Sequence, residues 1–165
     1  MKRILITGTS RGLGKSLVEI LAANGDEVIS LGRSNCEINV PHIACDFNIP
    51  ENLKGLFFSN KLLKKHFDIV ILNAGTLGNI LEAQQVSKDS LLQTFFVNFF
   101  SNKFIIDGCL QNSNKSQKFI YVSSGASKKA YTGWLEYCSS KSATDAMLRV
   151  YARENPQHIF CSISP

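Results

Sequence analysis

Residues 3–25 read RILITGTSRGLGKSLVEILAANG. A short, mostly β-branched apolar run is followed by a glycine-rich turn and then by a helical pattern, which predicts a helix with Leu17, Ile20 and Leu21 on its apolar face. Gly25 stands where a glycine commonly ends a helix. A strand, a glycine-rich turn and a helix N-terminus together form an anion site, because glycines let the backbone approach and the helix amides face the charge.

The same alternation of apolar runs and helical patterns continues along the chain. Near-continuous apolar runs are typical of parallel strands that are buried on both faces. The order predicts a single α/β domain with a parallel sheet that helices cover on both faces. Only about ten residues, 32–41, join the second and third strands, so we expect an irregular connection there. Strands are predicted at 3–7, 27–31, 42–45, 68–73, 118–124 and 159–164, and helices at 12–24, 51–65, 87–111 and 134–154.

The composition excludes several functional classes. The net charge of +5 is spread over short clusters such as Lys64-Lys65 and Lys128-Lys129, and no basic run is interleaved with aromatic residues. This pattern argues against a nucleic-acid partner and favours an anionic small molecule. The five cysteines contain no C-x-x-C pair and the three histidines lie far apart, so we predict neither a disulfide framework nor a metal site.

No targeting or membrane segment is recognisable. The first apolar run is too short for a signal peptide, and no stretch of about 18 apolar residues occurs. We therefore expect a cytoplasmic protein with reduced thiols and no membrane partner.

Two motifs overlap in the glycine-rich turn. Gly8-x-x-x-Gly12-x-Gly14 is a widened variant of the dinucleotide-binding glycine fingerprint. Gly8-Thr9-Ser10-Arg11-Gly12 also matches G-x-S-x-G, the nucleophile elbow of serine hydrolases. An elbow needs an oxyanion loop from an earlier strand, and only seven residues precede Gly8, so a hydrolase is disfavoured.

The end of the second predicted strand indicates which dinucleotide would bind. In NAD sites a carboxylate about 20 residues beyond the glycines holds the ribose 2′-hydroxyl. Here the strand ends in Leu31-Gly32-Arg33-Ser34, without an acid. Because a guanidinium fits a 2′-phosphate, Arg33, with Arg11 as a second contact, favours NADP(H) over NAD(H). The alternative is that Arg33 is merely an exposed loop residue.

With further motifs, the whole chain resembles a classical short-chain dehydrogenase/reductase. The resemblance implies a Rossmann-type doubly wound parallel sheet in the strand order 3-2-1-4-5-6, with the family's seventh strand missing from the given sequence. The spacing of thirteen residues between Ser124 and Tyr137 matches that family and selects Ser124 over Ser123. The stretch 123–141, SSGASKKAYTGWLEYCSSK, resembles the sepiapterin reductase and benzil reductase subgroup, whose members reduce vicinal dicarbonyl groups with NADPH. The family marks are, in order, Thr7-Gly8-x-x-x-Gly12-x-Gly14, Asp46, Asn73-Ala74-Gly75, Asn98, Ser124 and Tyr137-x-x-x-Lys141.

The resemblance implies a catalytic role for four residues. Tyr137 and Lys141 are about one helical turn apart, so both side chains leave the same face. An ammonium at that position stabilises a phenolate, which makes the phenol a usable acid or base near neutral pH. Tyr137 would exchange a proton with a ketone oxygen, and Ser124 would donate a hydrogen bond to it. Asn98 would bend its helix and hold a water that links to Lys141, or would simply satisfy nearby backbone groups.

The resemblance also implies how a dinucleotide would be held. Amides around Ser10 to Leu13 would meet the pyrophosphate, the Asp46 side chain and the Phe47 amide would meet the adenine, and the backbone at 73–75 would meet the adenosine ribose. Trp134 either walls a substrate pocket or packs. The expected cofactor-binding residues are Gly8, Ser10, Arg11, Gly12, Leu13, Gly14, Arg33, Asp46, Phe47, Asn73, Ala74 and Gly75, together with Tyr137 and Lys141.

Two departures from the family pattern bear on the function. Leu72 replaces the first asparagine of the usual Asn-Asn-Ala-Gly, and the sequence stops at Ile163-Ser164-Pro165, where family members continue with a substrate loop, a helix and a seventh strand. We therefore expect the single domain, 1–165, to lack a C-terminal part, and the substrate cannot be read.

The predicted function is reduction of a small-molecule ketone or dicarbonyl by NADPH. The resemblance implies a homodimer or homotetramer formed through 87–111 and 134–154. Two alternatives are a non-catalytic NADP-binding sensor or scaffold, and an extended-branch epimerase or dehydratase. The last uses Gly-x-x-Gly-x-x-Gly, which positions 8–14 do not show.

Overall fold

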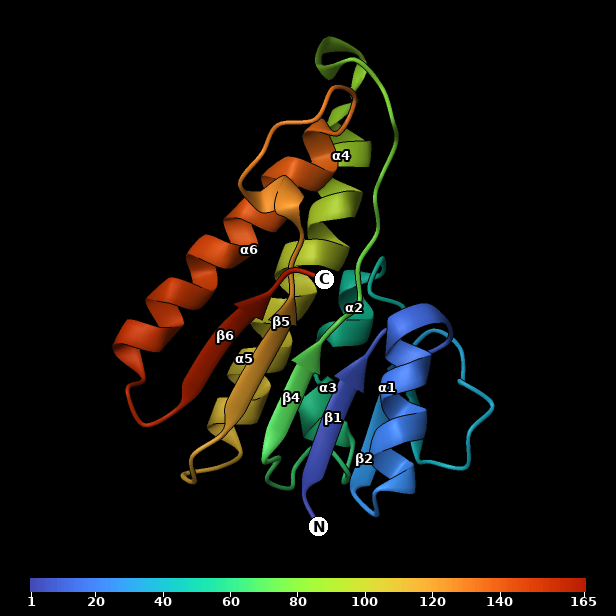
Figure 1. Cartoon of the computed structure of the whole chain (residues 1–165), viewed down its shortest axis with the longest axis vertical. Helices are drawn as coiled ribbons and strands as arrows, with labels where there is room; N and C mark the ends of the chain where they lie inside the picture. Colours follow the sequence, from blue (N-terminus) through green and yellow to red (C-terminus); the bar gives the residue numbers. More distant parts are fainter.

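The computed structural model describes residues 1–165 and contains one parallel sheet of six strands, in the predicted order β3-β2-β1-β4-β5-β6 (Figure 1). All six strands were predicted from the sequence, with ends that differ by at most two residues. The strands are β1 (Arg3–Thr7), β2 (Glu27–Gly32), β3 (His42–Ala44), β4 (Ile69–Leu72), β5 (Lys118–Val122) and β6 (Ile159–Ile163).

Three of the four predicted helices are present. They are α1 (Gly12–Ala23), a continuous helix made of α4 (Lys88–Phe95), the π-helical turn η2 (Phe96–Phe100) and α5 (Ser101–Gln111), and α6 (Leu135–Glu154). The short 3-10 turns η1 (Ala83–Gln85) and η3 (Gly125–Ser127) precede α4 and α6. The connection 32–41 is irregular, as predicted.

The helix predicted over 51–65 is wrong. Two single turns stand in its place, α2 (Pro50–Leu53) and α3 (Leu56–Ser59). Lys54 is extended and Gly55 has a φ of 74°, a left-handed conformation that a continuing helix does not adopt. Beyond α3, Oδ1 of Asn60 accepts a 2.9 Å hydrogen bond from the amide of Leu62, a turn that competes with helix.

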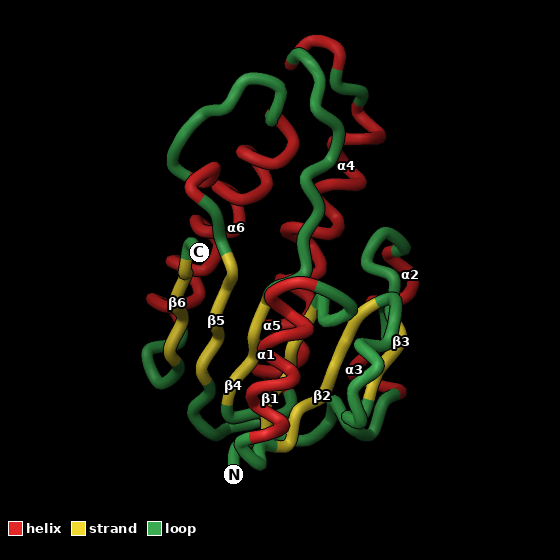
Figure 2. Tube along the Cα trace, turned by 45° about the vertical axis from the view of Figure 1, so that its right-hand side comes forward, coloured by secondary structure: helices red, strands yellow, loops and turns green.

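The two faces of the sheet carry separate cores, because successive strand residues point to opposite faces. On one face, Ile4 and Ile6 pack with Val18 of α1 and with Cys36 from the irregular connection. On the other face, Leu5 belongs to a larger cluster that includes side chains of α2, α3, α5, α6 and η2. Figures 1 and 2 show α1 on one side of the sheet and α3 and α5 on the other.

The predicted apolar face of α1 was wrong at one residue. Ile20 is 58% exposed, whereas Val18 is fully buried and Leu17 and Leu21 pack beside it. The stripe of α1 that faces the sheet therefore runs through Val18 and not through Ile20.

The carboxyl ends of β1 and β4 form the point where a ligand site is expected. These neighbouring strands lead to α1 on one face and to α4 on the other, so the loops after them diverge. Such a divergence leaves a crevice at the strand ends. Figure 2 shows α4 extending beyond these ends. None of the helices is both long and apolar enough to cross a lipid bilayer.

Candidate active site

The glycine-rich turn after β1 is held tightly against the end of β4. Gly8 has a φ of 68°, and a Cβ there would lie 2.7 Å from Cα of Ala74. The Asn73 amide group donates to the carbonyl oxygens of Thr7 (3.0 Å) and Gly8 (2.9 Å), and the Thr7 hydroxyl oxygen accepts from the backbone amides of Asn73 and Ala74. A Cβ on Gly14 would overlap the carbonyl oxygen of Gly8. Glycine is therefore required at both positions.

A cavity of about 800 Å³ opens over this turn, within the size range of small-molecule and cofactor sites. The N-terminus of α1 at the cavity has no side-chain cap, so its first amide groups remain available to an anion. These features fit a dinucleotide. All twelve residues predicted for cofactor binding outside the catalytic helix line this cavity, and Thr9, Gly32, Ser34, Asn48, Thr76, Leu77 and Val97 complete it.

Two arginines lie at this cavity without a carboxylate partner. Arg11 and Arg33 are both exposed and take part in none of the ion pairs of the structure. Asp46, the acid nearest to them in the lining, has one carboxylate oxygen engaged by the backbone and side-chain amides of Asn48, each at 3.0 Å. The guanidinium groups are therefore available for an anionic ligand.

The candidate acid/base pair on α6 has the predicted geometry. Nζ of Lys141 lies 5.5 Å from the ring centroid of Tyr137 and 4.7 Å from that of Tyr121, and it donates a 2.8 Å hydrogen bond to the carbonyl oxygen of Val122. The Lys141 side chain is buried. Burial lowers the pKa of Lys141 to about 8, and the carboxylate of Asp145 acts in the opposite direction. The ammonium thus sits between the phenol ring and the end of β5.

The two serines at the end of β5 have different partners. The Ser123 hydroxyl is buried and donates to Oδ2 of Asp145 at 3.0 Å. Ser124, which precedes η3, accepts a 3.2 Å hydrogen bond from the amide of Ala126, so its own hydroxyl hydrogen is free to be donated elsewhere. The choice of Ser124 as the catalytic serine stays a prediction.

Asn98 lies fully buried in the π-helical turn η2, which interrupts the regular helix. Its side chain accepts from the amide of Thr76 (2.8 Å) and donates to the Thr76 carbonyl (2.8 Å) and to Oγ of Ser140 (2.9 Å). The Asn98 carbonyl accepts from the side chains of Asn102 and Thr144. Asn98 therefore satisfies local groups, as one of the two interpretations held, and the water relay stays a prediction.

Aromatic rings adjoin the candidate acid. The Trp134 ring stands edge-on to Tyr137, with centroids 5.7 Å apart, and packs against Tyr131 at 5.1 Å. Trp134 thus touches the residue that would carry the chemistry.

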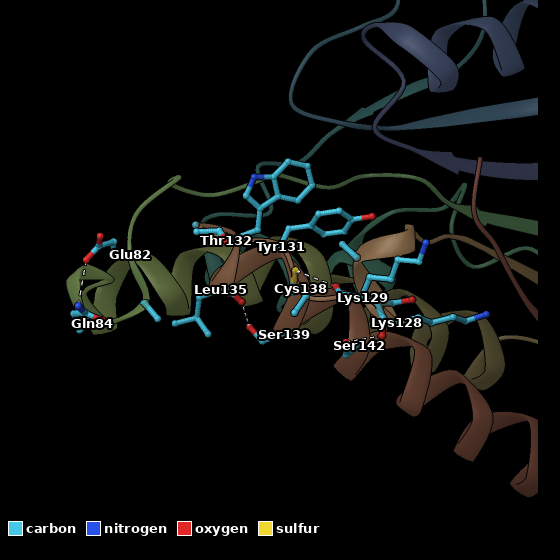
Figure 3. A pocket seen from close by; sticks show the side chains of 16 residues that line it. Glu82, Gln84, Lys128, Lys129, Tyr131, Thr132, Leu135, Cys138, Ser139 and Ser142 are labelled. Carbon is cyan, nitrogen blue, oxygen red and sulfur yellow. Dashed lines mark hydrogen bonds between the residues drawn. The ribbon is translucent and has the colours of Figure 1, made fainter.

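A second cavity of about 800 Å³ lies beside α6 (Figure 3). It is bounded by η1, by the loop between η3 and α6, and by Cys138, Ser139 and Ser142 of α6. Neither Ser124, Tyr137 nor Lys141 lines it. This cavity is therefore separate from the candidate reacting groups.

Sequence reasoning missed the side chains that hold these groups in place. Thr76 and Ser140 bind Asn98, and Asp145 binds the end of β5. Asp145 had a usable signal, because it is one helical turn beyond Lys141 and on the same side of α6. Thr76 had none, since its contact spans 22 residues of chain.

The chain matches the family model described as short chain dehydrogenase over residues 2–163. It is 30% identical to the benzil reductase ((S)-benzoin forming) of Saccharomyces cerevisiae, over 94% of this chain and 66% of the relative. It is 25% identical to the benzil reductase ((S)-benzoin forming) of Bacillus cereus, over 93% and 69%. The chain thus spans about two thirds of the length of these relatives.

A solved structure is also similar. The KRED1-Pglu enzyme superposes with a TM-score of 0.84 at 31% identity, over 99% of this chain and 73% of that one.

Proposed function

Because the chain belongs to the short-chain dehydrogenase family, we propose that it is an NADPH-dependent oxidoreductase that reduces a ketone or dicarbonyl of a small molecule to an alcohol. One observation carries the proposal. The buried ammonium of Lys141 lies between the Tyr137 ring and the end of β5, beside the crevice at the glycine-rich turn. The benzil reductases among its relatives make a vicinal diketone the first substrate to test.

The bound coenzyme supplies the hydride. In the proposal its pyrophosphate is held at the turn from Ser10 to Gly14, where the uncapped α1 offers amide groups. Lys141 and Tyr137 hold the nicotinamide ribose. The adenosine lies along the part of the cavity lined by Arg33, Asp46 and Phe47.

The protein's own groups manage the proton. As the carbonyl carbon gains hydride, its oxygen acquires negative charge and takes the proton of the Tyr137 hydroxyl, which leaves a phenolate. The Lys141 ammonium stabilises that phenolate. The Ser124 hydroxyl, whose hydrogen is uncommitted, donates to the same oxygen while the charge develops.

The preference for NADPH rests on two guanidinium groups. Arg33 and Arg11 border the adenosine part of the cavity and have no internal carboxylate partner. A 2′-phosphate would give these guanidinium groups a charged partner that matches their forked geometry.

We further propose a homodimer or homotetramer formed through α4–α5 and α6. Phe104 of α5, and Leu135 and Val150 of α6, are each at least 39% exposed, and a second copy would cover them. We propose a cytoplasmic location because all five cysteines are free thiols.

The test is the consumption of NADPH, followed by absorbance, with a panel of vicinal diketones, simple ketones and pterins. We expect Tyr137→Phe to lower kcat by about 10²- to 10⁴-fold, the usual contribution of a general acid. Tyr151→Phe is the matched control, since Tyr151 lies near the other end of α6 and bonds Asp107. Turnover that is equal in wild type and Tyr137→Phe would overturn the assignment, and tight NADPH binding without turnover would favour the sensor alternative.

A further inference from the structure

Asp145 is a buried carboxylate with no role in the proposed reaction. It lies on α6 four residues after Lys141 and is 9% exposed. Its Oδ2 accepts a 3.0 Å hydrogen bond from the hydroxyl of Ser123, directly after β5, and its Oδ1 accepts a 2.6 Å hydrogen bond from the Ser162 hydroxyl of β6. One side chain of the catalytic helix is thus fastened to two strands.

No cation touches this carboxylate. The ion pairs of the structure involve neither Asp145 nor Lys141. Two serine hydroxyls satisfy the hydrogen-bonding capacity of Asp145 but do not neutralise it, and a buried charge without compensation is costly. Lys141 has the complementary problem, since the residue is only 3% exposed and its ammonium donates to a carbonyl oxygen and lies over two aromatic rings.

The two buried charges are placed to compensate each other. Residues four apart share a side of the helix, and an interior of low dielectric constant screens the attraction weakly even without direct contact. The pKa values agree with this geometry, because burial lowers the pKa of Lys141 and the Asp145 carboxylate raises it.

The other groups around the pair have different roles. Tyr121 of β5 and Tyr137 of α6 present neutral rings to Lys141. Gly75, after β4, lies close to both Asn98 of η2 and Lys141, because a Cβ on it would be 3.4 Å from Oδ1 of Asn98 and 3.6 Å from Nζ of Lys141. The side chain that η2 contributes near Lys141 is thus a neutral amide and carries no charge. Lys128 and Arg149 border a cleft with Asp145, but both are exposed, and solvent screens them more strongly.

We propose that Asp145 is a positioning residue for the reaction. Its negative charge, held by hydrogen bonds at the carboxyl ends of β5 and β6, keeps the Lys141 ammonium protonated. The role of Lys141 in turnover rests on the proposed function, but the charge coupling itself does not. The proposal also gives a reason for Ser123, which spacing excluded from catalysis. Its hydroxyl holds the carboxylate that acts on Lys141.

The test is a direct titration of Lys141 in the coenzyme-free protein. Lysine labelled with ¹³C at Cε is followed by NMR from about pH 6 to about pH 10, and the Lys141 signal is assigned by its absence in Lys141→Met. We expect a midpoint of about 8 in wild type. In Asp145→Asn, which keeps the size and one of the two acceptor oxygens, we expect a midpoint lower by about one unit. At about pH 8 the protonated fraction would then fall from about one half to about one tenth.

Controls separate the charge from the fold. Glu154→Gln removes an exposed carboxylate from the same helix and should leave the midpoint unchanged. Asp145→Glu keeps the charge and should restore most of the wild-type value. If Asp145→Asn does not fold, Asp145→Ser is titrated in its place. An unchanged midpoint in a folded neutral variant overturns the proposal, as does an equal shift in Glu154→Gln.

Turnover provides an independent reading. If the reductase function holds, the fall in kcat/KM at alkaline pH should begin about one unit lower in Asp145→Asn than in wild type. A protein without reductase activity would contradict the proposed function, and the NMR titration would still decide the role of Asp145. A shifted NMR midpoint with an unshifted activity profile would overturn the catalytic part of the inference.

Discussion

At Lys141, burial and chemistry act in opposite directions. The proposed reaction needs an ammonium there, but burial lowers the pKa of Lys141 from its ordinary 10.5 to about 8. Between these two values the unfolded chain binds more protons at this position than the folded one. Folding stability from this residue therefore rises with pH over that interval, while the protonated fraction that catalysis requires falls.

Lys141→Met should make this opposition visible. We expect the free energy of unfolding of wild type, relative to that of the variant, to rise by up to about 3 kcal/mol between about pH 7 and about pH 10.5. Over the same interval the activity of wild type should decline. Urea unfolding at a series of pH values measures the first quantity. A difference that stays constant with pH would show that the folded protein does not depress the pKa of Lys141.

Arg33 should determine the choice of coenzyme. We expect Arg33→Ala to weaken NADPH binding about 10- to 100-fold, because a charged hydrogen bond contributes about 1.5–3 kcal/mol. NADH lacks the 2′-phosphate, so its affinity should change little. Fluorescence titration of both coenzymes measures the effect, and Arg153→Ala, an exposed site in the last turn of α6, is the control. Equal losses for NADPH and NADH would contradict the assignment.

Single residues show what the sequence could reveal. Spacing alone selected Ser124, and the structure shows Ser123 bonded to Asp145. Motifs carry such information because catalytic groups stand at fixed places on their elements. Asp145, Thr76 and Glu136 were missed because their partners lie 17 to 57 residues away in sequence.

At the scale of elements, α6 joins three parts of the molecule. Tyr137 and Lys141 face the strand ends, and Asp145 reaches β5 and β6. Glu136 points elsewhere and is fully buried. Its carboxylate accepts from the hydroxyls of Ser90 (2.6 Å) and Thr94 (2.5 Å) of α4, and from the amide of Asn79 (3.3 Å). This carboxylate ties α4 and the loop after β4 to the start of the catalytic helix.

Glu136→Ala should therefore destabilise the protein strongly. Removal of the buried carboxylate leaves the buried Thr94 hydroxyl, the half-buried Ser90 hydroxyl and the Asn79 amide without their acceptor, and we expect a loss of about 3 kcal/mol or more. Glu136→Gln keeps one acceptor oxygen and should lose less. Urea denaturation measures both, with Glu19→Ala on the exposed side of α1 as the control. If Glu136→Ala and Glu19→Ala lose the same free energy, the carboxylate does not hold these elements together.

Elements also show where periodicity fails as a guide. The apolar spacing over 51–65 resembles a helix, but a left-handed Gly55 splits it into two turns. In α1 the pattern was correct and the face was shifted, since Ile20 is exposed and Val18 is buried. The period of the apolar residues indicates that a segment can form a helix. The packing of the neighbouring elements then decides which face of that helix is buried.

At the scale of the whole molecule, the topology was predictable and the packing was not. Alternating strands and helices with right-handed crossovers allow few arrangements and predict a parallel sheet, and the family resemblance added the strand order that the structure has. The same topology brings the ends of β1, β2, β3 and β4 to one cavity, where all twelve residues predicted from motifs meet. The separate cavity beside α6 had no sequence signal, because a loop and the outer side of a helix form it.

The most direct measurement follows a deuterium atom. Benzil is reduced with NADPH that carries deuterium at both hydrogen positions of C4 of the nicotinamide, and mass spectrometry and NMR locate the label in the product. The account predicts one deuterium on the new carbinol carbon, and a rate of label transfer that falls about 10²- to 10⁴-fold in Tyr137→Phe. A reduced product without deuterium on that carbon, or a transfer rate unaffected by Tyr137→Phe, would contradict it.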